Sequence, residues 1–215
     1  MRITHLGHAA VLVETSNQRV LLDPGNFDDT WHGLTDLDAV LVTHQHPDHL
    51  DPEHFPALLA ANPDAKVWVE PQVLDAVDLG DAVDRVQPLV ADSSVDLGSL
   101  TVAAVGGVHA VIHRDIPVIG NVGLMLIAEG EPTFFHPGDS LATCPSGVDV
   151  LGVPFHGPWA ALKETIDFVR EVGAPKAFGI HDGLLNERGR KLVTDRLTGM
   201  TDTEILDLRG GPVDF

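Results

Sequence analysis

Short apolar runs alternate with turn residues along most of this 215-residue chain. Runs rich in valine, leucine and isoleucine that end at turn residues are typical of β-strands. Glycine occurs 21 times and proline 15 times, so we expect many tight loops between short elements. The pattern predicts strands at Ile3–Leu6, Ala10–Glu14, Val20–Asp23, Ala39–Thr43, Lys66–Val69, Leu100–Val105, Val122–Ala128, Thr133–His136, Val148–Val153, Lys176–Ile180 and Glu204–Leu208.

Helical signals lie between several of these strands. An Asp-Pro pair at 51–52 supplies a capping residue and a proline in the first turn, which predicts a helix through about Ala61. Apolar residues recur at helical spacing between charged ones over Ala160–Val172, and Gly173 is suited to end that helix. A third helix is predicted at Glu187–Leu197.

The organisation of the chain indicates a single α/β domain over residues 1–215. The length suits one domain with a substantial core. No linker, repeat or low-complexity stretch interrupts the sequence. We therefore expect sheets inside and helices outside.

The charge of the chain is strongly negative, with 13 Lys and Arg against 32 Asp and Glu, a net charge of −19. Such a field repels phosphate backbones, so nucleic acid is not an expected partner. The nearest approach to a basic cluster, residues 188–191, has the pattern of a helix face.

Targeting and redox signals are few. Cys144 is the only cysteine, which excludes an internal disulfide and fits a reducing compartment. The apolar stretch Ala9–Val13 is too short for a signal sequence, and no window reaches the length of a membrane helix. We expect a cytoplasmic protein without a membrane partner.

The most informative motif is Thr43-His44-Gln45-His46-Pro47-Asp48-His49, directly after an apolar strand. In extended chain, residues two apart point the same way, so His44 and His46 can reach one metal ion together. Pro47 turns the backbone, and Asp48 and His49 can then face a second ion. Imidazole and carboxylate suit Zn²⁺ and its first-row neighbours. A solvated histidine-rich loop is the alternative, and the specific order and spacing disfavour it.

Further candidate ligands follow other predicted strands. His109 comes after Gly106-Gly107, Asp139 lies in the turn 137–140, and His181 ends the strand at 176–180. Any one of them alone would more often be a polar residue that is hydrogen-bonded at a strand end. Their joint recurrence at strand ends favours metal ligation.

This order of motifs resembles the metallo-β-lactamase superfamily: His-x-His-x-Asp-His, a lone His, Gly-Asp-Ser, and a final lone His. The resemblance covers nearly the whole chain. Two shorter motifs, at 6–10 and 21–24, look like the branch that contains ascorbate-6-phosphate lactonase and many metal-dependent hydrolases.

The resemblance implies a four-layer αββα sandwich, with two mixed β-sheets and helices outside, and a site at one sheet edge. It also implies two divalent metal ions, with Zn²⁺ as the first expectation and Mn²⁺ or Fe²⁺ as alternatives. Asp23 would lie beneath the ligands and orient them. The implied ligands are His44, His46 and His109 for one ion, Asp48, His49 and His181 for the other, and Asp139 for both.

The chemistry expected of such a site is hydrolysis of a small ester, lactone or phosphoester by a metal-bridging hydroxide. Asp48 would orient the nucleophile or return its proton to the leaving group. His113 and His156 are candidates for protonating a leaving group or binding a substrate anion, and His8 is a weaker one. For each, an exposed loop histidine is the alternative.

Other functions stay open. A phosphodiesterase acting on cyclic nucleotides or lipid-derived diesters is one alternative, and a non-catalytic metal-binding sensor or scaffold is another. Diiron oxidoreductases of the resembling fold carry acidic residues in the second motif, where this chain keeps His46, Asp48 and His49. The absence of the large inserted domain of RNA-processing members weighs against a nuclease. We expect a small-molecule substrate, and the oligomeric state is open, a homo-oligomer included.

Overall fold

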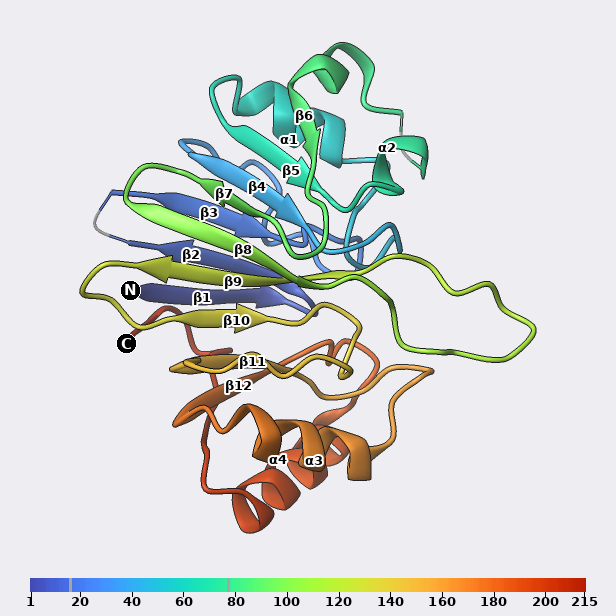
Figure 1. The fold of residues 1–215 in the computed structure, drawn as a ribbon, viewed down its shortest axis with the longest axis vertical. Coiled ribbons are helices and arrows are strands. Elements are labelled where there is room, and N and C mark those ends of the chain that lie inside the picture. Colours follow the sequence, from blue (N-terminus) through green and yellow to red (C-terminus); the bar gives the residue numbers. More distant parts are fainter. Residues whose placement is uncertain (16, 77) are drawn as a thin grey trace.

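Two seven-stranded β-sheets pack face to face in the computed structural model, which describes residues 1–15, 17–76 and 78–215 (Figure 1). The first sheet has the order β14-β1-β2-β3-β4-β5-β6 and the second the order β13-β12-β11-β10-β9-β8-β7. The strands of the first sheet are β1 (Arg2–Gly7), β2 (Ala10–Glu14), β3 (Arg19–Leu22), β4 (Ala39–Val42), β5 (Lys66–Val69), β6 (Val86–Pro88) and β14 (Val213–Asp214). Those of the second are β7 (Ser94–Asp96), β8 (Leu100–Gly106), β9 (Val122–Ala128), β10 (Phe134–His136), β11 (Val150–Pro154), β12 (Lys176–Ile180) and β13 (Glu204–Leu206).

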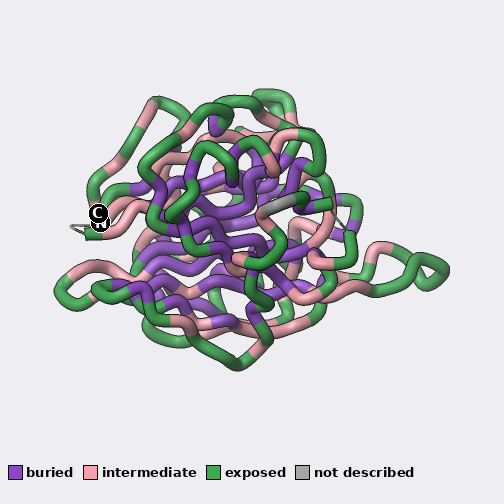
Figure 2. The backbone as a smooth tube through the Cα atoms, turned by 90° about the horizontal axis from the view of Figure 1, so that it is seen from above, coloured by how far each residue is buried: buried purple, intermediate pink, exposed green. Residues whose placement is uncertain are grey.

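Helices cover the outer face of each sheet. The first sheet carries α1 (Phe55–Ala61), with α2 (Val73–Ala76) and the 3-10 helix η1 (Gly80–Arg85) nearby. The second carries α3 (Leu162–Val172) and α4 (Glu187–Met200). One apolar core lies between the sheets and one under each helical layer, which confirms the predicted αββα sandwich. Buried backbone is concentrated in the central strands (Figure 2).

Both sheets are mixed, and their topology leads the candidate ligands to one edge. Strand β4 pairs in parallel with β3 and β5, and β10 to β13 are parallel to one another. Strand β4 is buried at all four positions, as expected for a parallel strand covered on both faces. The loops that follow β4, β10 and β12 meet beside the projecting loop 107–121 after β8, which we call the arm (Figure 1).

Several details differ from the sequence-based expectations, and the short helices α2 and η1 were not predicted. The first helix begins at Phe55, because the side chain of Asp51 caps a separate turn by accepting from the backbone N–H groups of Glu53 and His54. The fourth helix runs on to Met200. The strands β6, β7 and β14 were not predicted, because they have two or three residues and mostly exposed or half-buried positions. Such segments have no apolar run to recognise.

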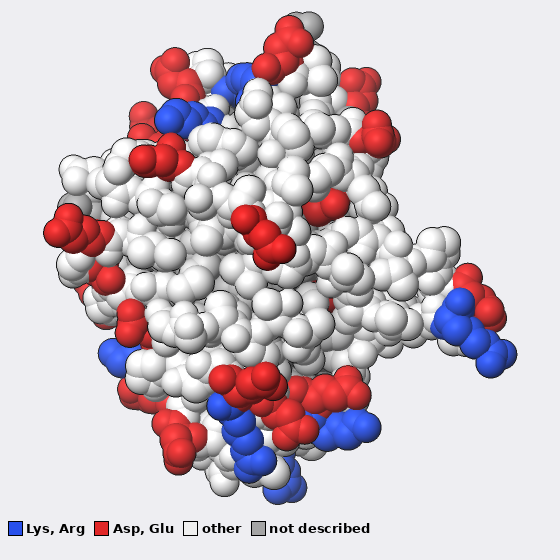
Figure 3. Space-filling view, in the orientation of Figure 1, with Lys and Arg blue, Asp and Glu red and all other residues white. Residues whose placement is uncertain are grey.

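The surface agrees with the acidic composition. Figure 3 shows acidic side chains scattered over one face, with basic ones in small separate groups. Among the described helices, none is long and apolar enough to cross a bilayer.

Candidate metal centre

The seven side chains that the sequence predicts as metal ligands lie together at one edge of the sandwich. Their donor atoms fall into two groups, each within 4.8 Å. One group comprises His44, His46, His109 and Asp139, and the other comprises Asp48, His49, His181 and, in addition, His8. This grouping matches the division between two ions that the resemblance implies, with Asp139 grouped on the first side.

The carboxylate of Asp139 lies between the two groups. Its Oδ1 is 3.0 Å from His49 Nε2, and its Oδ2 is 3.0 Å from His181 Nε2. The same Oδ2 is 3.4 Å from His109 Nε2 and 4.0 Å from His44 Nε2. Two ligands of a tetrahedral zinc ion, bound at about 2.1 Å, lie about 3.4 Å apart. The spacing of these donors therefore suits direct coordination.

The rings of three of these histidines are fixed by partners on the side away from the cluster. His49 Nδ1 donates to Asp23 Oδ2 at 2.7 Å, and His109 Nδ1 donates to the carbonyl of Ala110 at 2.6 Å. His181 Nδ1 donates to the carbonyl of His156. Because these partners only accept, Nδ1 holds a proton and Nε2 faces the cluster, where its lone pair can bind an ion.

Thr43 and Asp23 extend this support to His44. The Thr43 hydroxyl donates to Asp23 Oδ2 at 2.7 Å, so its lone pair accepts from His44 Nδ1 at 3.0 Å. The Thr43 backbone N–H donates to Asp23 Oδ1 at 2.7 Å. One fully buried carboxylate therefore orients His49 directly and His44 through a hydroxyl. The structure places Asp23 where the resemblance implies it.

Several buried atoms in the cluster lie within ion-pair distance of a neighbour but make no hydrogen bond of normal geometry among the described residues: His49 Nε2, His109 Nε2, His181 Nε2 and Asp139 Oδ1. Buried polar atoms are normally paired, and four orphaned atoms that converge on one place indicate a missing partner. Imidazole nitrogens and a carboxylate oxygen at these distances fit divalent first-row ions.

The electrostatics of the cluster attract positive charge. Burial by itself would lower the pKa of His181, but Asp139 and Asp48 raise it to about 9. Burial also opposes the charge on His49, yet Asp139 and Asp23 raise its pKa well above the ordinary value. Burial, helped by the charge on His49, lowers the pKa of His44. In the metal-free chain, protons on two imidazoles thus balance the buried carboxylates, and cations could replace them.

His8 is the residue whose role the sequence underestimated. Its Nδ1 accepts from the backbone N–H of Gly183 at 3.0 Å, so Nε2 carries the proton and donates to Asp48 Oδ2 at 3.1 Å. Burial lowers the pKa of His8 to about 4, which keeps the ring neutral. His8 therefore holds Asp48 in place and does not offer a lone pair to a metal. The sequence signal for His8 was the motif at residues 6–10, but that motif does not show which residue the His8 ring contacts.

Backbone strain is concentrated at the same place. Among the described non-glycine residues with positive φ, His8 (47°), Asp23 (45°) and His181 (50°) all belong to this cluster. Such conformations are unfavourable for side chains of this size and persist where surrounding structure enforces them, often at functional sites.

Trp159 contacts the carboxylate of Asp139. It is buried and donates its indole N–H to Asp139 Oδ2 at 2.8 Å. Its ring lies edge-on to His109 and His181, with centroids 6.2 and 5.9 Å apart. The indole thus fixes the carboxylate that joins the two groups.

The structure does not bring His113 or His156 into the two groups of described donors. The side chain of His113 is 56% exposed on the arm, where it pairs with Asp115 at 3.6 Å. The side chain of His156 is exposed, and its carbonyl rather than its ring contacts His181. Their catalytic roles stay predictions.

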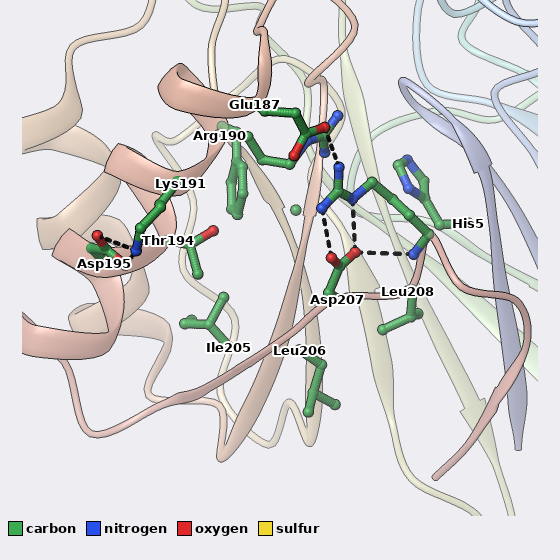
Figure 4. Close-up of a pocket in the computed structure, with 13 residues that line it drawn as sticks. His5, Glu187, Arg190, Lys191, Thr194, Asp195, Ile205, Leu206, Asp207 and Leu208 are labelled. Atoms are coloured by element: carbon green, nitrogen blue, oxygen red, sulfur yellow. Dashed lines mark hydrogen bonds and ion pairs between the residues drawn. The ribbon is translucent and has the colours of Figure 1, made fainter.

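A separate cavity of about 310 Å³ lies between α4 and β13 (Figure 4). Charged side chains in its wall pair with one another: Arg209 contacts Asp207 and Glu187, and Lys191 contacts Asp195. These charges are thus already neutralised by neighbours. The orphaned donors lie at the histidine cluster, which is therefore the stronger candidate for the functional site.

Comparison with known proteins identifies relatives of this chain. The family description "Beta-lactamase superfamily domain" matches residues 2–181. Protein Rv0786c of Mycobacterium tuberculosis is 41% identical over 205 residues, covering 95% of this chain and 94% of that protein. A UPF0173 metal-dependent hydrolase of Rhizobium etli is 29% identical over 65% of this chain and 63% of its own. The metallo-beta-lactamase fold protein YhfI of Bacillus subtilis superposes with a TM-score of 0.74 at 13% identity, covering 100% of this chain and 99% of that one.

Proposed function

Because the chain belongs to the metallo-β-lactamase fold family, we propose that it is a metal-dependent hydrolase with a two-ion centre. The observation that carries the proposal is the Asp139 carboxylate, which lies between two groups of converging donors. A carboxylate shared by two donor groups suits two ions better than one. The hydrolase assignment is supported by relatives described as metal-dependent hydrolases.

In this proposal His44, His46 and His109 hold one ion, Asp48, His49 and His181 hold the other, and Asp139 contacts both. Zn²⁺ is the first candidate, and Mn²⁺ or Fe²⁺ fit the same ligands. When bound, the ions supply a water of lowered pKa and polarise the oxygen that gains charge in the reaction. Asp23 and Thr43 keep the ligand rings oriented.

Asp48 is the candidate for proton transfer. Its side chain is 20% exposed, and its Oδ2 accepts from His8 Nε2 and lies 3.4 Å from His181 Nε2. Burial alone would raise the pKa of Asp48, but His181, His8 and His49 lower it, so the group is a carboxylate at neutral pH. It can orient an attacking water and carry its proton to the leaving oxygen.

The substrate we propose is a small ester, lactone or phosphoester. The acidic surface disfavours multiply charged anions. The arm adjoins the centre through His109 and exposes four apolar side chains: Val108, Val111, Ile116 and Val118. These favour a substrate with an apolar portion. They also make a phosphodiesterase for lipid-derived diesters the second candidate.

The test combines metal content and turnover. Protein purified without chelator or nickel should hold at least two ions per chain by mass spectrometry and should hydrolyse a lactone, a carboxylic ester or bis(p-nitrophenyl) phosphate. Asp139→Ala should weaken the binding of both ions and abolish turnover. Lys191→Ala, on the exposed face of α4, should change neither the metal content nor the turnover. Fewer than two ions after reconstitution would overturn the two-ion centre. Full loading without turnover on any substrate would favour a sensor or scaffold.

A further inference from the structure

A second cluster of metal-binding side chains lies outside the proposed centre. His32, Asp51 and His54 each offer a donor atom, and these atoms lie within 4.8 Å of one another. We propose that these three residues form an additional site for a divalent first-row transition ion. The two-ion centre uses none of them, so the proposal does not depend on the hydrolase function.

Asp51 is held so that one oxygen is directed at both rings. Its Oδ1 accepts from the backbone N–H groups of Glu53 at 2.9 Å and His54 at 3.4 Å. Its Oδ2 lies 2.7 Å from His54 Nδ1 and 3.9 Å from His32 Nε2. The side chain is only 5% exposed. Because capping of the turn uses Oδ1, Oδ2 is available to an ion without loss of the turn.

The two imidazoles are arranged by their neighbours. Their rings stack with centroids 4.2 Å apart and an interplanar angle of 29°. His32 also lies edge-on to Trp31, at 4.4 Å, and the buried Trp31 donates its indole N–H to the carbonyl of Gly25 at 2.9 Å. The His32 and His54 side chains remain 32% and 44% exposed, so an ion can reach them from solvent.

The donor set selects the class of ion. Two imidazole nitrogens and one carboxylate oxygen are a common zinc ligand set, with the fourth position left to water. Donors around a tetrahedral ion lie about 3.4 Å apart, and the observed 2.7 and 3.9 Å lie on either side of this value. Small rotations of two partly exposed rings would equalise them. The ion would replace the proton that His54 Nδ1 shares with Asp51.

The surroundings add a favourable field. The cluster lines an open hollow of about 600 Å³ whose described lining also includes Asp28, Asp29 and Glu53 and contains no lysine or arginine. Carboxylates alone would suit Ca²⁺ or Mg²⁺, whereas the two imidazoles favour Zn²⁺, Ni²⁺ or Cu²⁺. Phe27 lines the same hollow and packs on His8, with centroids 4.5 Å apart. An ion here would therefore help to fix the position of the loop that carries Phe27, beside the proposed centre.

The test is a Zn²⁺ titration of the metal-free full chain, followed by calorimetry and by the imidazole NMR signals. We expect the wild-type chain to bind one equivalent more than His32→Ala and His54→Ala, or these variants to bind that equivalent at least tenfold more weakly. Asp51→Asn, which retains a capping oxygen, should also lose it. Asp29 lines the hollow but is not one of the three donor residues, so Asp29→Asn should still bind the additional equivalent.

A His46→Ala background separates this site from the two-ion centre. There the additional equivalent should persist and shift the ring signals of His32 and His54, even if the hydrolase proposal fails. Equal stoichiometry and affinity in wild-type, His32→Ala and His54→Ala chains would overturn the inference. So would ring signals that Zn²⁺ leaves unchanged.

Discussion

The buried carboxylate of Asp23 gives the sharpest test of how the centre is built. It accepts three hydrogen bonds of 2.7 Å, from the backbone and hydroxyl of Thr43 and from His49 Nδ1. Asp23→Asn keeps an oxygen for the backbone N–H but presents an amide N–H₂ to the other two donors. Asparagine tolerates the positive φ of 45° at this position, so the backbone is not the variable.

The expected magnitude follows from the two broken hydrogen bonds. Each donor left unpaired in this fully buried site costs about 1–3 kcal/mol, so we expect about 2–6 kcal/mol lower stability in the metal-free chain. Loss of the partner that orients a metal-bound imidazole typically lowers metal affinity about 10- to 100-fold. Because Asp23 supports His49 directly and His44 through Thr43, both ions should be affected.

Two measurements check this prediction. Competition with a chromophoric chelator gives the metal affinities, and urea unfolding of metal-free protein gives the stability. Thr43→Val keeps the shape of the side chain but removes the hydroxyl, so it should weaken mainly the binding of the ion held by His44. If Asp23→Asn bound both ions with wild-type affinity, the inferred orientation of the imidazoles by Asp23 would be wrong.

Three further predictions concern other parts of the cluster. In His8→Asn, asparagine tolerates the positive φ but cannot supply the Nε2–H that His8 donates to Asp48. We expect kcat to fall about 10-fold or more at unchanged metal content. An unaltered kcat would exclude the positioning role. Folding raises the pKa of His181 from 6.5 to about 9, which contributes at most about 3 kcal/mol to the stability of the metal-free chain. This contribution should be complete below pH 6.5 and disappear as the pH rises through 9. Urea midpoints that do not fall over this range would contradict it. Gly25→Ala would place a Cβ 1.8 Å from the Asp48 carbonyl oxygen and should destabilise by about 3 kcal/mol or more, whereas Gly199→Ala, in open space on α4, should be neutral or stabilising in thermal melts.

The fold was largely predictable because its central strands are long apolar runs that end at glycine, proline or a polar motif. Strand β4 is a clear case, since four buried residues lead directly into the histidine motif. The spacing of that motif also predicted which of its side chains would converge. The short strands β6, β7 and β14 could not be predicted from the sequence, because they form by pairing with a neighbouring strand and have no recognisable side-chain pattern.

The partners of the candidate ligands were less predictable. The bond from His8 to Asp48 joins residues 40 positions apart, and that from Trp159 to Asp139 joins residues 20 apart. A single sequence shows that such residues are present but not that they meet. His156 follows an apolar strand, as the sequence indicates, and the structure adds that its carbonyl, rather than its ring, contacts His181.

The two sheets are joined by hydrogen bonds at the edge where the ligands lie, and this links metal binding to the stability of the whole fold. The His181 N–H donates to the His8 carbonyl at 2.8 Å, and the Val122 N–H donates to the Thr43 carbonyl at 2.9 Å. Stacked sheets normally lie about 10 Å apart, too far for such bonds, so the chain segments at these strand ends must approach each other. Both bonds end at or beside a candidate ligand, so an ion bound at the candidate centre would contact residues of both sheets at this edge. Ions that bind only the closed edge must therefore stabilise the sandwich as a unit, by about 2.7 kcal/mol at a free concentration 100 times the Kd.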